Sequence, residues 1–253
     1  MRRIKLIVAY DGTEYSGWQI QPEAPTIEMY LDKAIRELTG ENVHVTGASR
    51  TDAGVHAYGN VAVFDTESTI PGDRFTFALN RFLPDSIVIQ DSWEVSGDFH
   101  PRHCNTRKTY EYRILNTAVP LPQKRNFTWH VAGSVDIEKM KEAAAYIVGE
   151  HDFKSFCCVR TQAESTVRTI YSLEVLQEGS EIIIRIKGNG FLYNMVRIIT
   201  GTLIQVGKGR FTPEYVKQML EAKDRTVAGQ TAPPQGLTLV GIEYVDNDDA
   251  RVV

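Results

Sequence analysis

Two patterns of apolar spacing alternate along the first hundred residues. A period of two, as in Ile4, Leu6 and Val8, predicts a strand with one buried face, whereas apolar residues at i, i+3, i+4 and i+7 predict an amphipathic helix. The expected strands cover residues 3–10, 42–46, 60–65 and 87–95, and the expected helices cover residues 26–40 and a segment beginning near Pro71. This order, β-α-β-β-α-β, is that of a ferredoxin-like unit.

The second half of the chain repeats this order of elements without a clear repeat of residues. Strands are expected at residues 108–115, 167–176, 181–187 and 237–244, and helices at residues 136–148, 191–206 and 213–223. The predicted fold class is therefore α+β, with two ferredoxin-like (RRM-like) halves whose mainly antiparallel sheets surround a central cleft. We expect the halves to cover residues 1–100 and 101–253.

Composition places the chain among ordinary globular proteins. Its 253 residues are 42% hydrophobic and 24% charged, which excludes disordered, fibrous and membrane classes. Stretches without charge, such as residues 198–207, are far shorter than the roughly 20 apolar residues that span a bilayer, and the basic N-terminus lacks the apolar region of a secretory signal. Three cysteines, two of them adjacent, do not describe a disulfide framework. We expect a cytoplasmic protein with reduced thiols and no membrane contact.

The average charge hides a local basic segment. The net charge is −4, which argues mildly against a nucleic-acid binder, yet residues 102–130 hold six bases, one acid and four large aromatic residues. The bases are Arg102, Arg107, Lys108, Arg113, Lys124 and Arg125. Such a segment either neutralises RNA phosphates and stacks bases, or is a solvated strand face with its aromatic residues in the core. On the first interpretation, Arg102, Arg107 and Lys108 are the candidate RNA contacts.

The most unusual segment is residues 48–57, between two expected strands. Arg50 and Asp52 lie two residues apart among small residues, which allow a substrate to approach the backbone. A carboxylate in such a loop can serve as a nucleophile or a base. The alternative is an Asp or Thr that closes a turn through side-chain hydrogen bonds.

Signals for a metal or a nucleotide cofactor are incomplete. His100, His103 and Cys104 could supply part of a metal site, but the only other candidate pair, Cys157 and Cys158, is adjacent and not at zinc spacing. Residues 207–210 (GKGR) lack the Ser or Thr and the spacing of a phosphate-binding P-loop. We expect neither a metal nor a nucleotide cofactor.

Six motifs occur in a fixed order along the chain. They are residues 8–21 (VAYDGTEYSGWQIQ), 49–57 (SRTDAGVHA), 108–114 (KTYEYRI), 167–170 (VRTI), 190–203 (GFLYNMVRIITGTL) and 228–237 (AGQTAPPQGL). Together they resemble the TruA family of tRNA pseudouridine synthases, and the resemblance covers essentially the entire chain. Six ordered motifs are far more specific than any one of them.

The resemblance implies an isomerase that detaches uracil from ribose at N1 and reattaches it through C5, without a cofactor. It puts the catalytic aspartate at Asp52, the active-site tyrosine at Tyr110 and the basic partner of the aspartate at Arg197. Arg50 is then the arginine that enters the RNA stack as the target nucleotide turns out. The implied substrate is the anticodon stem-loop of tRNA at uridines 38, 39 and 40, and the implied assembly is a homodimer.

Three positions depart from the family pattern. Ser49 stands where glycine is usual, Asn60 where glutamine is common, and Glu28-Met29 replaces a glutamine-led helix start. None of them removes a proposed catalytic group, but they bear on which uridines the chain modifies. A non-catalytic RNA-binding or folding-assistance protein is the competing hypothesis, and formation of product discriminates between the two.

Overall fold

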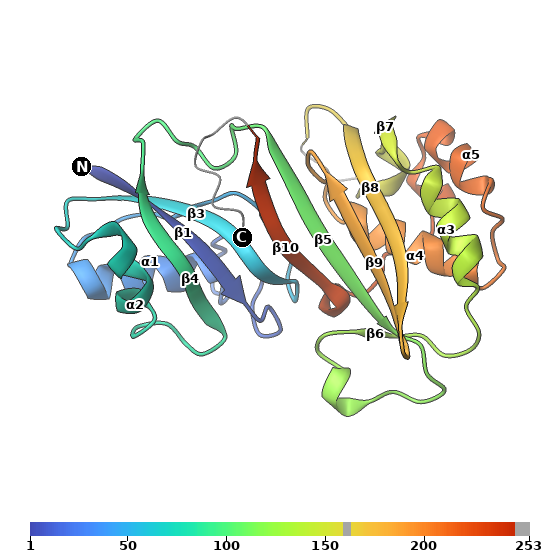
Figure 1. The fold of residues 1–253 in the computed structure, drawn as a ribbon, viewed down its shortest axis with the longest axis horizontal. Coiled ribbons are helices and arrows are strands. Elements are labelled where there is room, and N and C mark those ends of the chain that lie inside the picture. Colours follow the sequence, from blue (N-terminus) through green and yellow to red (C-terminus); the bar gives the residue numbers. More distant parts are fainter. Residues whose placement is uncertain (159–162, 246–253) are drawn as a thin grey trace. The chain divides into compact units, whose positions relative to one another are not determined.

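The chain folds into two compact units. The structure is a computed structural model that describes residues 1–158 and 163–245. Unit 1 comprises Met1–Thr106 and the chain from Leu239 onward, and unit 2 comprises Arg107–Thr238. Figure 1 shows the elements of both units as a ribbon. Their mixture of helices with mainly antiparallel sheets confirms the predicted α+β class.

Unit 1 is built on a sheet in which β1 lies between β3 and β4 and runs antiparallel to both. Its elements are β1 (Arg2–Tyr10), α1 (Ile27–Thr39), β2 (Thr46–Gly47), β3 (His56–Thr66), the 3₁₀ turn η1 (Gly72–Arg74), α2 (Phe75–Leu79), β4 (Ile87–Val95) and β10 (Leu237–Tyr244). β2 pairs with β3, and β10 is a neighbour of β3 in the sheet. The order of the first six helices and strands is the predicted β-α-β-β-α-β.

Helix α1 follows from its sequence pattern. Ile27, Leu31 and Ile35 are fully buried, as the helical spacing predicts. Gly40 adopts φ 76° immediately after the helix, a left-handed conformation that glycine reaches without a Cβ penalty, and its N–H donates to the carbonyl of Arg36. The helix therefore ends where the sequence predicts.

Two expected elements of unit 1 are shorter than predicted. The strand expected at residues 42–46 is reduced to Thr46–Gly47, because the Asp32 carboxylate from α1 accepts the backbone N–H of Val45 at 2.8 Å in place of a strand partner. The second helix, expected from near Pro71, begins at Phe75 after η1 and ends at Leu79. There the side chain of Asn80 donates to the carbonyl of Ile89 and accepts its N–H, at 3.0 and 2.7 Å.

Unit 2 contains the sheet β5-β9-β8-β7, in which neighbouring strands are antiparallel. Its strands are β5 (Thr106–Leu115), β6 (Trp129–His130), β7 (Gly149–Asp152), β8 (Val167–Glu178) and β9 (Glu181–Gly188). Its helices are α3 (Ile137–Ala145), α4 (Met195–Gly207) and α5 (Tyr215–Ala222), with 3₁₀ turns η2 (Pro122–Lys124), η3 (Lys154–Phe156), η4 (Arg225–Val227) and η5 (Pro234–Gly236). The short strand β6 runs parallel to β5.

Several features of the second half differ from expectation, among them the helix expected at residues 136–148, which ends at Ala145. Helix α4 begins at Met195 and not at residue 191, because Asn194 adopts φ 62° and interrupts helical geometry. The sequence predicts neither β6, which has only two residues, nor β7, whose residues GEHD show no apolar alternation. The last strand, expected in the second half, falls in unit 1 from Leu239 onward.

Two further findings concern membrane-spanning helices and the state of the cysteines. Within residues 1–158 and 163–245, no helix combines the length and apolar character that crossing a bilayer requires. Cys104, Cys157 and Cys158 are all free thiols.

Candidate active site

The loop that carries Asp52 is tied to the motif at residues 8–21 by backbone hydrogen bonds. The N–H of Trp18 donates to the carbonyl of Thr51 at 3.1 Å, and the N–H of Gly54 donates to the carbonyl of Tyr15 at 3.2 Å. Within the loop, the N–H of Val55 donates to the carbonyl of Asp52 at 3.1 Å. The two motifs therefore form one structural feature, which fixes the backbone around Asp52 before substrate arrives.

A buried side-chain network supports the same loop. Asn60, fully buried on β3, donates to the carbonyl of Ser49 at 3.0 Å and accepts the N–H of Ser49 at 3.3 Å. The Tyr10 hydroxyl lies 2.7 Å from the Thr51 hydroxyl and accepts a longer bond from Asn60, at 3.4 Å. Thr51 is thus held from β1 and Ser49 from β3, on the N-terminal side of Asp52.

Close approach between chain segments explains three glycines in or beside these motifs. A Cβ at Gly12 would overlap the carbonyl of Val55, and a Cβ at Gly47 would overlap the Trp18 ring. A Cβ at Gly17, which adopts φ +94°, would lie 2.6 Å from the carbonyl oxygen of Thr51. These positions require glycine because two chain segments meet there without space for a side chain.

The two candidate residues of this loop differ in exposure. Arg50 is exposed, whereas Asp52 is half-buried. Between them, Thr51 is buried and bonded to Tyr10, so the loop directs alternate residues toward the core and toward the surface. An exposed arginine beside a half-buried carboxylate can contact RNA while the carboxylate meets an extruded nucleotide.

In unit 2, Tyr110 lies on β5 with 8% of its surface exposed. Its ring packs edge to face against Phe191, with ring centroids 5.1 Å apart and an interplanar angle of 83°. Phe191 comes from the segment that leads into α4. Two of the six motifs, at residues 108–114 and 190–203, therefore meet at this aromatic pair.

Arg197, in the first turn of α4, is oriented by two hydrogen bonds. Its Nε donates to the carbonyl of Ala232 at 2.7 Å, and its Nη1 donates to the Asn194 side chain at 2.8 Å. The N–H of Ala232 in turn donates to the carbonyl of Arg197 at 3.1 Å. The guanidinium is therefore held by the motif at residues 228–237 as well as by its own helix.

The motif at residues 228–237 packs closely on α4 and β5. A Cβ at Gly201 would overlap the carbonyl of Gln230, and the N–H of Gly229 donates to the Thr202 hydroxyl at 2.9 Å. The hydroxyl of Tyr112, next but one after Tyr110, donates to the carbonyl of Pro233 at 2.7 Å. Burial raises the pKa of Tyr112, and the nearby positive charge of Arg197 opposes this shift only in part. The tyrosine and arginine motifs of unit 2 thus share one packed region.

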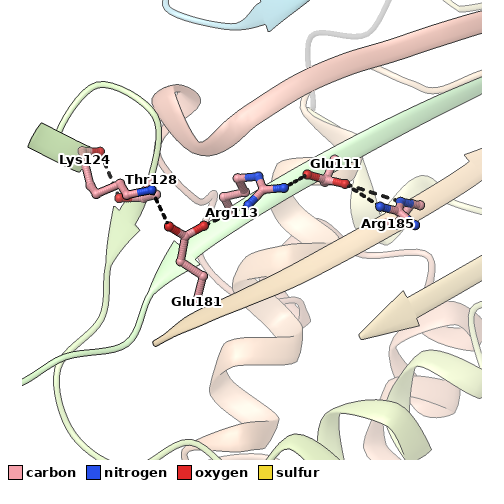
Figure 2. A network of polar contacts seen from close by, with 6 residues as sticks. All are labelled: Glu111, Arg113, Lys124, Thr128, Glu181 and Arg185. Atoms are coloured by element: carbon pink, nitrogen blue, oxygen red, sulfur yellow. Dashed lines mark hydrogen bonds and ion pairs between the residues drawn. The ribbon is translucent and has the colours of Figure 1, made fainter. Parts of the chain in front are cut away.

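A network of ion pairs engages two bases of the basic segment at residues 102–130 (Figure 2). Arg113 pairs with Glu111 at 2.7 Å and with Glu181 at 2.9 Å, and Lys124 pairs with Glu181 at 2.8 Å. Arg185 pairs with Glu111 at 2.9 Å. Burial of Glu181 is outweighed by Lys124 and Arg113, so the pKa of Glu181 falls below its ordinary value. Arg113 and Lys124 therefore support the fold, so fewer than six bases of residues 102–130 are available to RNA.

The predicted RNA contacts have different surroundings. Arg102 and Arg107 are exposed, and the Arg107 guanidinium lies over the half-exposed ring of Tyr171 at 5.2 Å. Lys108 is half-buried on β5 opposite Gly188 of β9. Arg50 and Asp52 belong to unit 1 with Arg102, whereas Tyr110, Arg197, Arg107 and Lys108 belong to unit 2.

The histidines of the incomplete metal signal are arranged as a ring stack. The rings of His100 and His103 lie parallel, with centroids 3.8 Å apart, and the Cys104 thiol donates to the carbonyl of His100. Within the described residues, no group of three or more His, Cys, Asp or Glu side chains is placed to hold a metal ion.

Sequence reasoning missed the residues that support the loop. Tyr10, Thr51 and Asn60 lie inside or beside the six motifs, but Tyr10 bonds to Thr51 41 residues away and to Asn60 50 residues away. The sequence offers one indication of this network, which is polar residues on expected strands next to a loop rich in small residues.

Comparison with known proteins gives a consistent result. A family model described as tRNA pseudouridine synthase matches residues 6–103 and 143–245. A "tRNA pseudouridine synthase A" of Ruminiclostridium cellulolyticum is 51% identical over 245 residues, covering 96% of this chain and 100% of the relative. Two further relatives are each 48% identical over 244 residues, covering 96% of this chain and 100% of the relative. They are a protein of the same name from Thermoanaerobacter sp. strain X514 and "tRNA pseudouridine synthase A 2" from Clostridium perfringens strain 13.

Proposed function

The chain belongs to the tRNA pseudouridine synthase family, and from that premise we propose that it modifies the anticodon stem-loop at uridines 38, 39 and 40, using Asp52. As a member of this family it is an isomerase that acts on tRNA. The observation that carries the proposal is the loop around Asp52. Hydrogen bonds to Trp18, Tyr15 and Asn60 hold this loop in place. A preorganised, half-buried carboxylate suits attack on a sugar carbon or removal of a ribose proton.

The reaction makes limited demands on the protein. Uridine and pseudouridine have the same composition: the N1–C1′ bond breaks, a C5–C1′ bond forms, C5 loses a proton and N1 gains one. No oxidant, reductant or group donor is therefore needed. The carboxylate of Asp52 either adds to C1′ and leaves again, or takes a neighbouring ribose proton and returns it, and both routes require its ionised form.

Tyr110 and Arg197 are our proposed partners of Asp52 in catalysis. Tyr110 offers an aromatic face to the extruded uracil and a hydroxyl that can pass a proton. Arg197 offers a positive charge, which favours the ionised form of a carboxylate. The hydrogen bonds from Arg197 to Ala232 and Asn194 support this role, because they hold the guanidinium in one orientation.

We propose that RNA is bound by Arg50, Arg102, Arg107 and Lys108. Arg50 would fill the stack as the target nucleotide leaves it, a step that costs a few kcal/mol. Arg107 lies over Tyr171, which leaves an exposed cation and aromatic ring side by side for phosphate and base. We also propose a homodimer that acts in the cytoplasm. Sedimentation of the purified protein tests the dimer, and fractionation of cells tests the location.

The experiment uses unmodified tRNA transcripts that keep a single uridine at position 38, 39 or 40. Mapping pseudouridine at nucleotide resolution should find product at each of these positions. Product only elsewhere in the tRNA would overturn the site assignment, and no product in any tRNA would overturn the proposed function.

A further inference from the structure

Arg168 is a half-buried arginine near the start of β8 whose charge the described structure does not neutralise. Its Nη1 donates to two backbone carbonyls, those of Ser165 at 2.9 Å and Val167 at 2.6 Å. Within residues 1–158 and 163–245 no carboxylate forms an ion pair with it, unlike Arg113 and Arg185 of the same unit. Burial lowers the pKa of Arg168. A partly desolvated cation without a counter-charge is costly unless an anion joins it.

Carboxylates of the neighbouring strand β7 are engaged elsewhere. Asp152 pairs with Lys223 at 3.2 Å and accepts the Thr166 hydroxyl at 2.5 Å. Glu150 accepts a long bond from the Thr169 hydroxyl at 3.5 Å. Since none of the described carboxylates pairs with Arg168, an anion from outside the chain can supply its counter-charge.

The backbone around Arg168 is fixed and leads directly to Tyr110. Thr169 and Asn189 form two reciprocal hydrogen bonds, both 3.0 Å long. The N–H of Thr169 donates to the Asn189 side chain, and the N–H of Asn189 donates to the Thr169 carbonyl. A Cβ at Gly190 would lie 3.7 Å from Nε of Arg168, so the guanidinium runs along the glycine backbone. The next residue is Phe191, whose ring contacts Tyr110.

We propose that Arg168 binds a phosphate of the RNA backbone beside the nucleotide that Tyr110 contacts. The planar guanidinium suits a phosphodiester, because Nε and Nη2 remain for two parallel bonds to its oxygens while Nη1 stays on the carbonyls. Arg168 thereby gives the motif at residues 167–170 a role in substrate positioning. The inference rests on the proposed function, since it takes tRNA as the ligand.

The test is the salt dependence of tRNA binding by the full chain. Each phosphate contact contributes about 0.7 to 0.9 to the slope of log K against log salt concentration. Arg168→Gln should lower that slope by this amount, whereas Arg168→Lys, which keeps the charge, should leave it near wild type. Lys217→Gln is the matched control, because it removes an exposed cation from α5 of the same unit and should leave the slope unchanged.

A second measurement does not require Arg168→Gln to fold. tRNA in which single phosphates flanking the target uridine are replaced by neutral methylphosphonates should bind wild type more weakly at one position, and Arg168→Lys, which keeps the charge, should show the same loss at that position. If no position matters to wild type, or if Arg168→Gln keeps the wild-type slope, the inference is overturned. An absence of tRNA binding by wild type would overturn it too. A lowered slope without pseudouridine formation would refute the proposed function and support the phosphate contact.

Discussion

Replacing Gly17 by alanine should displace the loop that carries Asp52. The new Cβ would lie 2.6 Å from the carbonyl oxygen of Thr51, and ordinary contact begins at 3.4 Å, so the two segments must separate by about 0.8 Å. The same carbonyl accepts the N–H of Trp18 at 3.1 Å, and this bond has to lengthen or rotate. Asp52 is the next residue along the chain, so it moves with Thr51.

The expected cost falls on catalysis more than on folding. A misplacement of about 1 Å can reduce turnover on the order of 10²-fold, which corresponds to about 2.7 kcal/mol of transition-state stabilisation. The strain of alanine at positive φ adds about 1–2 kcal/mol to the loss of folding stability. Gly40→Ala is the matched control, because Gly40 also has positive φ but nothing lies within 4 Å of its Cβ position.

The assay is single-turnover pseudouridine formation at saturating enzyme, with urea unfolding of each variant measured in parallel. Gly17→Ala should lose turnover about 10²-fold, while Gly40→Ala loses only the stability that the strain costs, about 1–2 kcal/mol, and keeps its turnover. Equal turnover in the two variants would refute the reasoning, because strain alone would then account for the effect of Gly17.

Three other predictions concern stability. Tyr10→Phe removes the hydroxyl bonded to Thr51 and Asn60 and should lower the free energy of unfolding by about 1–3 kcal/mol in urea titrations; an unchanged midpoint would show that the network is not stabilising. Ser49→Ala removes a buried hydroxyl that has no hydrogen-bond partner within the described residues, so stability should be unchanged or rise by about 1 kcal/mol, and a clear loss would reveal a bond to that hydroxyl. For Glu181 the folded-state pKa lies below the unfolded value of 4.5, so its stabilisation is present above pH 4.5 and is lost as the pH falls through the folded-state pKa. The stability difference between wild type and Glu181→Gln should therefore shrink on acidification, and a difference independent of pH would contradict the ion-pair network.

Local periodicity predicted most elements, because the burial of a helix or strand face leaves its own signal. Helix α1 shows this, since Ile27, Leu31 and Ile35 recur at helical spacing and are buried. Strand β7 carries no such signal, because its pairing with β8 selects it and its own residues do not alternate. Strand β2 is short because the Asp32 side chain accepts the N–H of Val45 in place of a strand partner, and no local pattern of residues predicts this bond.

The site was predictable as motifs but not as contacts. The resemblance assigned roles to Asp52, Tyr110 and Arg197 without indicating what holds them. Glu181 joins Arg113 and Lys124 although it lies 68 residues from Arg113, so counting charges within one segment could not detect that these bases are already paired. Long-range contacts of this kind depend on strand register, which only the folded chain defines.

The most direct test compares wild type with Asp52→Asn on the same unmodified tRNA. Asparagine has nearly the shape of aspartate but cannot carry its charge, so tRNA affinity should be retained while pseudouridine formation at positions 38, 39 and 40 disappears. Affinity is measured beside product to separate binding from chemistry. Pseudouridine formed by Asp52→Asn at the wild-type rate would contradict an essential role for the carboxylate.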